Sequence, residues 1–371
     1  MRILELTDAC SWSGGIEQLV LLTKGLVEKG HEIFIGCNSK SRLFKYAEGD
    51  KDIVPIVFDM HKEIDIKTIR EIIKFVRKNK IDIIHAHHSK AHTLGFIASL
   101  WLPETVFIYT RRVIFKIRKN PFSYYKYRSK RVDGIVAVSE AVKKILCYSG
   151  VSPQKITVIY SGVDINKFHP AIDGNKIRQE FNIKSDDVLI GKIANYSDYK
   201  GHDVFLKAAQ SVIKKCSYAK FIIVGEGTQN GTLEQITNEL GISGNVVFTG
   251  YRRDIPEIIS AFDVSVNVSN FEGLAGVIRE SSAVGKPVIA TSIGGNPEIV
   301  RDGETGYLVP CGDSLYLAEC ILKLIKNKEK LKEFGNKGRK FIEENFTTQI
   351  MIEKYIKLYE RLYKEREYNK D

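Results

Sequence analysis

The sequence predicts an α/β protein with two Rossmann-like domains in tandem, each a doubly wound parallel sheet. Short apolar runs alternate with helical patterns along the chain, which is typical of βαβ units. The alternation begins again after residue 170, so a single sheet does not account for all of it. The length of 371 residues also exceeds the roughly 250–300 residues at which single cores stop growing.

Elements of the first half follow from these patterns. Strands are expected where four to six residues are mostly apolar, and helices where apolar residues recur every three or four positions. The expected strands are 3–6, 32–37, 53–58, 81–86, 105–110 and 134–139, and the expected helices include 15–29 and 66–79.

The second half repeats the scheme after a turn-rich joint near 161–170. Its expected strands are 188–194, 220–224, 245–249, 264–268, 287–291 and 306–309. Its expected helices are 202–215, 231–240, 255–261, 276–284, 296–302 and 313–326. One or two helices are expected over 337–364, where Tyr355, Leu358, Tyr359 and Leu362 follow helical spacing. We therefore expect domains at 1–170 and 171–345, followed by a C-terminal helix within 346–371.

Charge is distributed unevenly between the halves. Residues 1–170 hold 28 Lys/Arg and 17 Asp/Glu, whereas the remainder holds 28 of each, so the net charge of +11 lies in the first half. Residues 111–131 carry nine cations and no acid, with aromatics interleaved. Such a segment attracts phosphates of lipid headgroups or nucleic acid. The alternative is a solvated basic helix.

Several classes of protein are excluded by simpler features. The six cysteines are scattered, without a CxxC pair, and are expected to be small buried hydrophobes in a reducing compartment. The N-terminal run carries Glu5 and Asp8, which predicts a buried strand and not a signal peptide. The apolar run 94–102 is shorter than the 18 or so residues of a membrane span.

The most informative motif places Glu272 and Glu280 eight positions apart around a glycine-containing turn. A helix that begins near Ala275 or Gly276 points its free N–H groups and positive dipole end at this turn, which favours an anion such as phosphate. Glu280 then lies about one turn in, roughly 6 Å along the axis. The two acids are suited to two hydroxyl-bearing parts of one ligand. Alternatively, they are ordinary acids near a helix start.

Other candidate residues also follow expected strands, at the edge where open parallel sheets bind ligands. Gly15 opens a helix without a GxGxxG motif, and its turn either faces a phosphate or is a plain βα turn. His85 and His87 share one face of a strand. No third ligand for a metal is visible beside them, so hydrogen bonding to a sugar or simple lining of a cleft is preferred. Lys200 is either a cation for a diphosphate or an exposed lysine.

In their order and spacing, these residues resemble the retaining glycosyltransferases of family 4, which have the GT-B fold. The resemblance covers nearly the whole chain. It rests on residues 14–18, 85–87, 161–164, 168–170, 200–201, 224–227, 272–280, 285–288, 294–298 and 303–306.

The resemblance implies a role for each candidate residue. The first domain would bind the acceptor and the second a nucleotide-sugar donor, and the last helices would cross back to the first domain. Glu272, His87 and Lys200 would be catalytic: Glu272 would hold the transferred sugar, His87 would face it, and Lys200 would neutralise the diphosphate. The acceptor would meet His87, Arg111 and Arg112. The donor would meet Gly15, Asn195, Lys200, Gly225, Tyr251, Arg252, Glu272, Gly273, Leu274, Ala275, Gly276 and Glu280.

Two departures from the family pattern affect the donor. Asn195 stands where many members have an arginine five residues before the lysine, so one guanidinium clamp is lost. The turn after Glu272 reads Gly-Leu-Ala-Gly where Gly-Phe-Gly is commoner.

The expected reaction is sugar transfer with retention, by a front-face route in which the leaving phosphate helps to deprotonate the acceptor. Because no DxD-type acidic pair is positioned for a metal, neither metal nor other cofactor is expected. The expected partners are a nucleotide sugar, a glycan or lipid-linked acceptor, and an anionic membrane through residues 111–131, but no nucleic acid. The context would be surface-polysaccharide or lipopolysaccharide assembly, in the cytoplasm or peripherally on the inner face of the plasma membrane. The alternatives are a sugar-nucleotide epimerase of the same fold and a non-catalytic binder of anionic lipid or nucleic acid.

Overall fold

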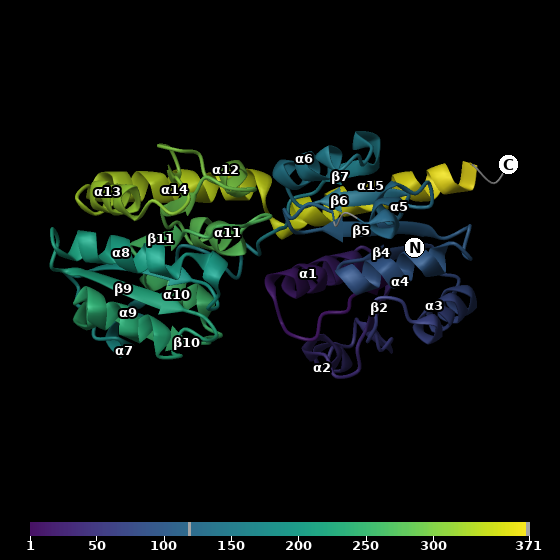
Figure 1. The fold of residues 1–371 in the computed structure, drawn as a ribbon, viewed down its shortest axis with the longest axis horizontal. Helices are drawn as coiled ribbons and strands as arrows, with labels where there is room; N and C mark the ends of the chain where they lie inside the picture. Colours follow the sequence, from purple (N-terminus) through teal and green to yellow (C-terminus); the bar gives the residue numbers. More distant parts are fainter. Residues whose placement is uncertain (118–119, 369–371) are drawn as a thin grey trace. The chain divides into compact units, whose positions relative to one another are not determined.

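The computed structural model describes residues 1–117 and 120–368, which form two compact units (Figure 1). Unit 1 comprises Met1–Gly162 together with the chain from Thr348 onward, and unit 2 comprises Val163–Thr347. The first boundary falls within the turn-rich segment 161–170, and the chain returns to unit 1 close to the expected residue 346. Among the described residues, no helix has an apolar stretch long enough to cross a bilayer.

Unit 1 is built on a seven-stranded sheet in which every pair of neighbouring strands is parallel. The strand order is β3-β2-β1-β4-β5-β6-β7, so the order reverses between β1 and β4. Ligands of such sheets bind at the carboxyl ends of the strands at this switch point. The strands are β1 (Arg2–Leu6), β2 (Glu32–Cys37), β3 (Val54–Val57), β4 (Ile83–Ala86), β5 (Val106–Arg111), β6 (Gly134–Ala137) and β7 (Ile156–Val158).

Helices of unit 1 include the last one of the chain, α15, which lies along this unit in yellow in Figure 1. Apolar residues of α15 and α1 pack together with the strands in one core cluster. A side-chain cap starts α1, where Ser13 accepts from the Ile16 N–H. The helices are α1 (Gly14–Glu28), α2 (Arg42–Glu48), α3 (Ile66–Asn79), α4 (Ser89–Ser99), α5 (Pro121–Arg128), α6 (Glu140–Tyr148) and α15 (Thr348–Tyr368).

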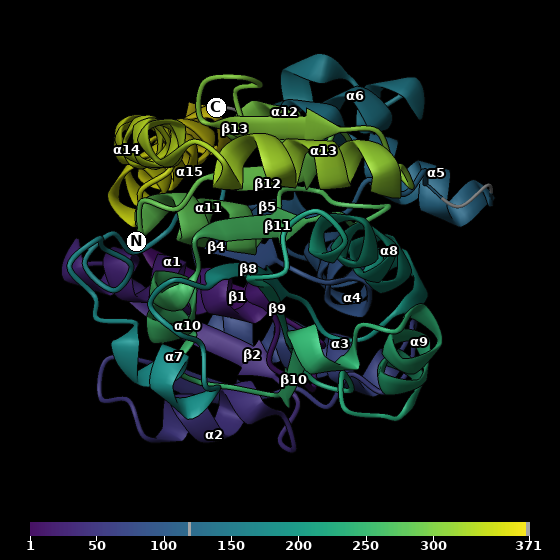
Figure 2. The same cartoon turned by 90° about the vertical axis from the view of Figure 1, so that its left-hand side faces the viewer.

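Unit 2 has a six-stranded parallel sheet in the order β10-β9-β8-β11-β12-β13, with its switch point between β8 and β11. Figure 2 shows helices on both sides of these strands, with α8 and α9 on one side and α10 and α11 on the other. The strands are β8 (Val188–Ile193), β9 (Ala219–Val224), β10 (Val246–Gly250), β11 (Val264–Asn267), β12 (Val288–Thr291) and β13 (Gly306–Val309).

Apolar faces of α8, α9 and α13 meet the strands in the core of unit 2. The helices are α7 (Asn175–Glu180), α8 (His202–Ile213), α9 (Thr232–Leu240), α10 (Ile255–Ala261), α11 (Gly276–Ala283), α12 (Asn296–Ile299), α13 (Ser314–Ile325) and α14 (Lys328–Asn345). Helices α14 and α15 are separate, because Thr347 pairs with Val163 between them. The expected helix 296–302 is shorter and ends at Ile299.

Cysteine burial differs in part from the expectation. Cys37, Cys216 and Cys320 are buried, but Cys10 and Cys311 are exposed, and all six are free thiols. The expectation that the cysteines are buried is therefore wrong for these two. The reason is that both exposed cysteines lie in loops outside the regular elements, where no pleat or helical face directs the side chain inward.

Candidate functional site

The first polar centre lies in unit 2, after the two strands at its switch point. Lys200 ends the short 3₁₀ helix η2 (Asp198–Lys200) that follows β8, and Glu272 lies in the loop after β11. The Lys200 Nζ is 2.7 Å from the Glu272 Oε1, and both side chains are partly exposed. The fold thus brings together a cation and a carboxylate that are 72 residues apart in the sequence.

Two local features fix the position of Lys200. Gly201 has φ +64°, and a Cβ there would lie 2.0 Å from the Val268 carbonyl oxygen, so the turn requires glycine. The buried Lys192 of β8 donates from its Nζ to the Lys200 carbonyl, at 2.7 Å. Burial, and next the charge of Lys200, lower the pKa of Lys192 to about 7.

The start of α11 lies between the two acids of the motif. The helix begins at Gly276, and its N-cap residue Ala275 provides no side-chain cap. A Cβ on Gly276 would be 3.4 Å from the Glu280 Oε1, so this carboxylate lies beside the first turn. Gly273 and Ala275 are buried and Leu274 is half-buried. The first-turn amides of α11 thus have no side-chain acceptor from their own N-cap.

The remaining donor candidates follow β8, β9 and β10. The Asn195 Oδ1 accepts from the Glu226 N–H at 2.9 Å. Gly225 has φ +155°, and a Cβ there would be 2.2 Å from the Ala194 carbonyl oxygen, so the two loops touch. Tyr251 is exposed. The Arg252 guanidinium is held by the carboxylates of Glu180 and Asp254, so its charge is already paired within unit 2.

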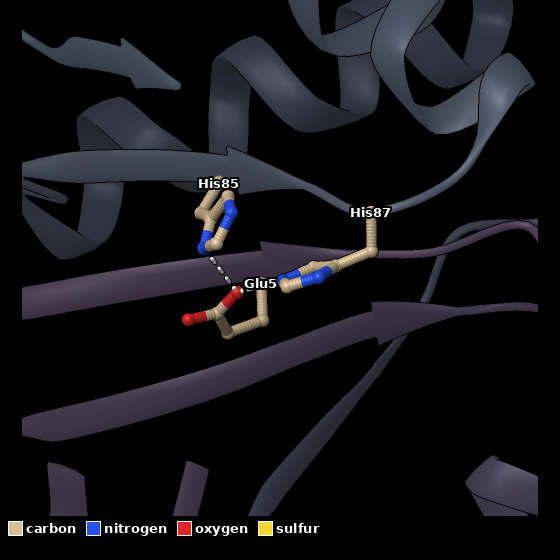
Figure 3. A group of neighbouring side chains, drawn as sticks. All are labelled: Glu5, His85 and His87. Carbon is tan, nitrogen blue, oxygen red and sulfur yellow. Dashed lines mark hydrogen bonds and ion pairs between the residues drawn. The ribbon is translucent and has the colours of Figure 1, made fainter. Parts of the chain in front are cut away.

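The second polar centre lies in unit 1 at the β1–β4 pair, where Glu5 meets His85 and His87 (Figure 3). Glu5 and His85 are partners in the strand register. The Glu5 Oε2 is 2.5 Å from the His87 Nε2 and 3.1 Å from the His85 Nδ1. None of the three side chains is exposed to solvent. The expectation that no third ligand lies near the histidines was therefore wrong. Glu5 lies on β1, which is far from β4 in the sequence but pairs with it in the sheet.

These three residues have the composition of a metal site, with ligand atoms within 4.8 Å of one another. Their atoms are, however, engaged in hydrogen bonds. The His85 Nδ1 is 2.6 Å from the Tyr359 hydroxyl, and its Nε2 is 2.7 Å from the Thr110 Oγ1. The Arg112 guanidinium is 3.1 Å from the His87 Nδ1. A neighbouring guanidinium opposes a second cation, so the arrangement favours a hydrogen-bonded network.

Protonation states in this network follow from burial and charge. Burial alone would raise the pKa of Glu5, but His85 and His87 lower that pKa well below its usual range. Burial, then His85 and Arg112, hold the pKa of His87 well below 6.5. Glu5 is thus a carboxylate and His87 a neutral ring. The His87 Nε2–H donates to Glu5 and its Nδ1 accepts from Arg112, so the ring reaches a substrate only if one bond opens.

The C-terminal helix closes the network from the other side. Tyr355 and Tyr359 of α15 are buried, and the Tyr355 hydroxyl is 3.1 Å from the Thr110 Oγ1. The Tyr359 hydroxyl also donates to the Glu5 Oε1, at 3.3 Å. The helical spacing in the sequence indicated that these tyrosines face a core. It gave no sign that the Tyr359 hydroxyl contacts a buried carboxylate and a histidine, or that the Tyr355 hydroxyl contacts Thr110.

Beside this network, unit 1 has a pocket of about 360 Å³ at the carboxyl ends of β4 and β5. Four of the predicted residues line it together: Gly15, His87, Arg111 and Arg112. Arg111 donates to the Tyr127 hydroxyl at 2.8 Å and to the Phe115 carbonyl at 2.6 Å. A Cβ on Gly15 would lie 3.4 Å from the Arg112 side chain, so this turn lies against the guanidinium-bearing chain.

The basic segment 111–131 turns only part of its charge outward. Lys126 is buried and donates to the Thr93 Oγ1. Arg131 donates to the carbonyls of three residues and pairs with Asp133, so it holds the interior of unit 1 together. Arg118 and Lys119 lie outside the described residues. The exposed cations of the segment are Lys116, Arg128 and Lys130.

Sequence reasoning missed two of the central residues, Glu5 as a partner of the histidines and Lys192 as a support for Lys200. Both are charged residues inside apolar strands. A charged residue is almost never fully buried unless it is paired. That rule could have marked both positions, although it does not say which partners the fold supplies.

Comparison with known proteins covers both units. A model of "Glycosyltransferase Family 4" matches residues 13–167, and a model of "Glycosyl transferases group 1" matches residues 173–341. The capsular polysaccharide biosynthesis glycosyltransferase CapM of Staphylococcus aureus is 27% identical over 369 residues, covering 95% of this chain and 97% of that protein.

Two further similarities are of comparable extent. The UDP-Gal:alpha-D-GlcNAc-diphosphoundecaprenol alpha-1,3-galactosyltransferase of Escherichia coli is 27% identical over 308 residues, or 80% of this chain and 79% of that protein. The crystal structure of Anabaena HepE in complex with UDP superposes with a TM-score of 0.87 at 23% identity, covering 97% of this chain and 100% of that one.

Proposed function

The chain belongs to the retaining glycosyltransferases of family 4 and has the GT-B fold, and we propose that unit 2 binds its nucleotide-sugar donor and unit 1 its acceptor. The observation that carries this assignment is the contact between Lys200 and Glu272 beside the start of α11. A cation, a carboxylate and uncapped helix amides together suit a sugar linked to a diphosphate. UDP is the first nucleotide to test, because the Anabaena protein was crystallised with it.

Each donor contact has a proposed chemical part. Glu272 accepts hydrogen bonds from hydroxyls of the transferred sugar, and Glu280 from the ribose. Lys200 and the amides of residues 274–276 stabilise the charge that grows on the leaving phosphate. Asn195 and Gly225 shape the loops around the diphosphate, and the backbone at Tyr251 and Arg252 meets the base.

Transfer proceeds in this proposal by a front-face route with retention. The bond between the anomeric carbon and the phosphate oxygen breaks while the acceptor hydroxyl oxygen bonds to the same face of that carbon. The hydroxyl proton passes to the leaving phosphate. Because Lys200 and the helix terminus carry the electrostatic stabilisation, we propose that no metal takes part. One such charge-stabilising group typically contributes a factor of about 10²–10³ to the rate.

The acceptor is proposed to be a glycan or a lipid-linked sugar of cell-surface polysaccharide or lipopolysaccharide assembly. The relatives support this, since CapM is named for capsular polysaccharide biosynthesis and the Escherichia coli enzyme for a diphosphoundecaprenol acceptor. His87, Arg111 and Arg112 would contact the acceptor at the unit 1 pocket.

A peripheral place on the cytoplasmic face of the plasma membrane is part of the same proposal. The exposed cations Lys116, Arg128 and Lys130 lie in one segment with the exposed Phe115 and Tyr125. Cations with interleaved aromatics suit an anionic leaflet. Sedimentation with anionic vesicles at low salt is the expected result, and its absence would remove the membrane from the proposal.

A panel of nucleotide sugars, read by thermal stabilisation, tests the donor assignment. A ligand at 100 times its Kd adds about 2.7 kcal/mol to the stability of the folded state. The stabilisation should disappear in Glu280→Gln and persist in Glu257→Gln, a change on the neighbouring helix α10. Incubation with the stabilising donor alone separates transfer from epimerisation, because an epimerised nucleotide sugar would contradict the proposal.

A further inference from the structure

Three of the residues that line the unit 1 pocket each carry a buried polar atom that has no hydrogen-bond partner in the described chain. These atoms are the Tyr109 hydroxyl, the Arg112 Nε and the His92 Nε2. Tyr109 is only 2% exposed and His92 only 4%. A buried polar atom without a partner costs about 1–3 kcal/mol, so three around one cavity indicate a ligand with polar atoms.

Positive charge dominates the surroundings of this pocket. Arg111 and Arg112 line it, and the buried Lys126 lies close behind. Burial, then Lys126 and Arg111, hold the pKa of His92 well below 6.5. Burial, and next Arg112, lower the pKa of His88 to about 4, although Asp8 opposes this. Two neighbouring imidazoles are thus kept neutral mainly by burial, with a smaller contribution from the cations around the pocket.

Nearby carboxylates are already committed elsewhere. Glu5 is bound to the two histidines, and Asp8 accepts from the Ala91 N–H at 2.9 Å. Within residues 1–117 and 120–368, no carboxylate forms a salt bridge with Arg112, whose recorded partner is the neutral His87. Burial lowers the pKa of Arg112, and Tyr355 and Glu5 offset this only in part, so the guanidinium lacks a full counter-charge. An anion in the pocket would supply that counter-charge.

The ligand's chemistry follows from the groups on offer. An arginine has only donors, and a tyrosine hydroxyl whose neighbours are cations also acts best as a donor. A neutral sugar would need acceptors as well, whereas a phosphate oxygen accepts from every one of these groups. A volume of about 360 Å³ suits a small ligand and not a whole glycan.

We infer that the unit 1 pocket binds a phosphate or diphosphate group of the acceptor, with Arg112 as its main counter-charge and Tyr109 as a hydroxyl donor. This rests on the proposed function, which assigns the acceptor to unit 1, and it narrows the acceptor to a phosphorylated one. Val113 lines the pocket and is exposed. Two exposed aromatic residues, Phe115 and Phe122, are close to it in the sequence. A phosphate here can therefore come from a lipid-linked or a soluble sugar.

The first test measures pyrophosphate binding by calorimetry in the full chain saturated with UDP. The wild type should bind. Arg112→Gln should lose about 10–100-fold in affinity and Tyr109→Phe about tenfold, as expected for bonds to a charged group. Tyr109→Phe should fold at least as stably as the wild type, because it removes only an unpartnered hydroxyl. Arg70→Gln and Tyr148→Phe, both at exposed positions of unit 1, are the matched controls.

UDP affinity of the same variants separates an acceptor phosphate from the donor's own diphosphate. If the inference is right, both variants keep the wild-type affinity for UDP. A parallel loss of UDP affinity would assign the pocket to the donor and overturn the inference. It also falls if the wild type binds no pyrophosphate at millimolar concentration, or if neither variant weakens binding.

The source of the phosphate is read from two acceptor analogues, a soluble glycosyl phosphate and a short-chain prenyl diphosphate sugar in detergent micelles. Weaker binding of either one in Arg112→Gln supports the inference and names the source. Failure of both would leave the proposed function standing, provided that Glu280→Gln still abolishes donor stabilisation. The two proposals can thus fail separately.

Discussion

The polar centres of the two units lie at the switch points of their sheets, but their charges are satisfied in different ways. In unit 2, Lys200 is paired directly with Glu272, and both side chains retain some contact with solvent. In unit 1, Glu5 is buried between two histidines and Tyr359 of α15, with no exposure. Arg112 beside it has a neutral histidine as its recorded partner.

This difference separates a centre built to exchange ligands from one built to hold a shape. An ion pair that keeps some contact with solvent opens more easily than a fully buried one, so Lys200 and Glu272 can exchange their mutual contact for contacts to a substrate. A buried carboxylate among hydrogen-bond donors is costly to disturb. Glu5 therefore acts as a positioning residue, which fixes the ring of His87 and its tautomer.

The largest effect is expected from Glu5→Gln in unit 1. Removal of one partner from a buried charged network costs about 3–5 kcal/mol of unfolding free energy. Denaturant titration of the full chain, followed by a signal from unit 1, measures it. Glu32→Gln on the adjacent strand β2 is the control, because its pair with Arg2 is half exposed and worth about 0–1 kcal/mol. Equal costs for the two variants would show that Glu5 is not a positioning residue.

A second prediction concerns unit 2 and the dependence of the unfolding free energy on pH above 7. The pKa of Lys192 is about 7 in the folded chain, against 10.5 for an ordinary lysine. Between these values the unfolded chain binds more protons, so the unfolding free energy of the wild type rises with pH from about 7 to about 10.5. Lys192→Met removes this dependence. At pH 7 the variant should be about 4 kcal/mol more stable than the wild type, minus the contribution of the hydrogen bond to the Lys200 carbonyl, which it loses.

Denaturation at pH 7 and near pH 10 checks this, since the advantage of Lys192→Met should shrink as pH rises. Lys207→Met on α8 is the control, because Lys207 is well exposed and should show no such trend. Parallel stability curves for Lys192→Met and the wild type would mean that Lys192 is not the titrating group.

The third prediction concerns the ion pair of Lys200 with Glu272 in unit 2, and its exchange for contacts to a substrate. Lys200→Ala should lower kcat by about 10²–10³, or about 2.7–4 kcal/mol in the barrier, because it removes a cation from the growing phosphate charge. Thermal stability should change little, since the pair is partly exposed. Lys214→Ala at an exposed site of unit 2 serves as the control. Full activity of Lys200→Ala would leave the pair without a role in transfer.

The strands of both sheets could largely be predicted from local hydrophobic patterns in the sequence. The polar centres could be predicted only in part. Apolar runs such as 32–37 and 306–309 have the bounds of β2 and β13, because a strand buried in a parallel sheet reads as a continuous hydrophobic run. Strand β7 has only three residues and gave too short a run to predict. The order of the strands sets which residues meet, and periodicity does not contain that order.

Candidate site residues were accessible to sequence reasoning where they lie next to a glycine that shapes a turn or opens a helix. Lys200 before Gly201 and Glu280 after Gly276 are of this kind, since the turn restricts the backbone locally. The meeting of Glu5 with His85 depends on a pairing across 80 residues of chain and was not visible. The role of Tyr359 depends on the return of α15 to unit 1. Long-range register, not residue chemistry, was the missing information.

The smallest effect is predicted where α15 packs on α1 to seal the unit 1 centre. A Cβ on Gly25 would lie 2.0 Å from the Ile352 Cδ1, so Gly25→Ala should cost about 1–3 kcal/mol by overpacking. Ile352→Ala in the same chain should recover part of it, because the clash is with the tip of that side chain. Gly14→Ala, at the other end of α1 with nothing within 4 Å, should cost nothing. If Gly25→Ala and Gly14→Ala behave alike, α15 does not dock tightly on α1, and the sealed character of the unit 1 centre would have to come from the strands alone.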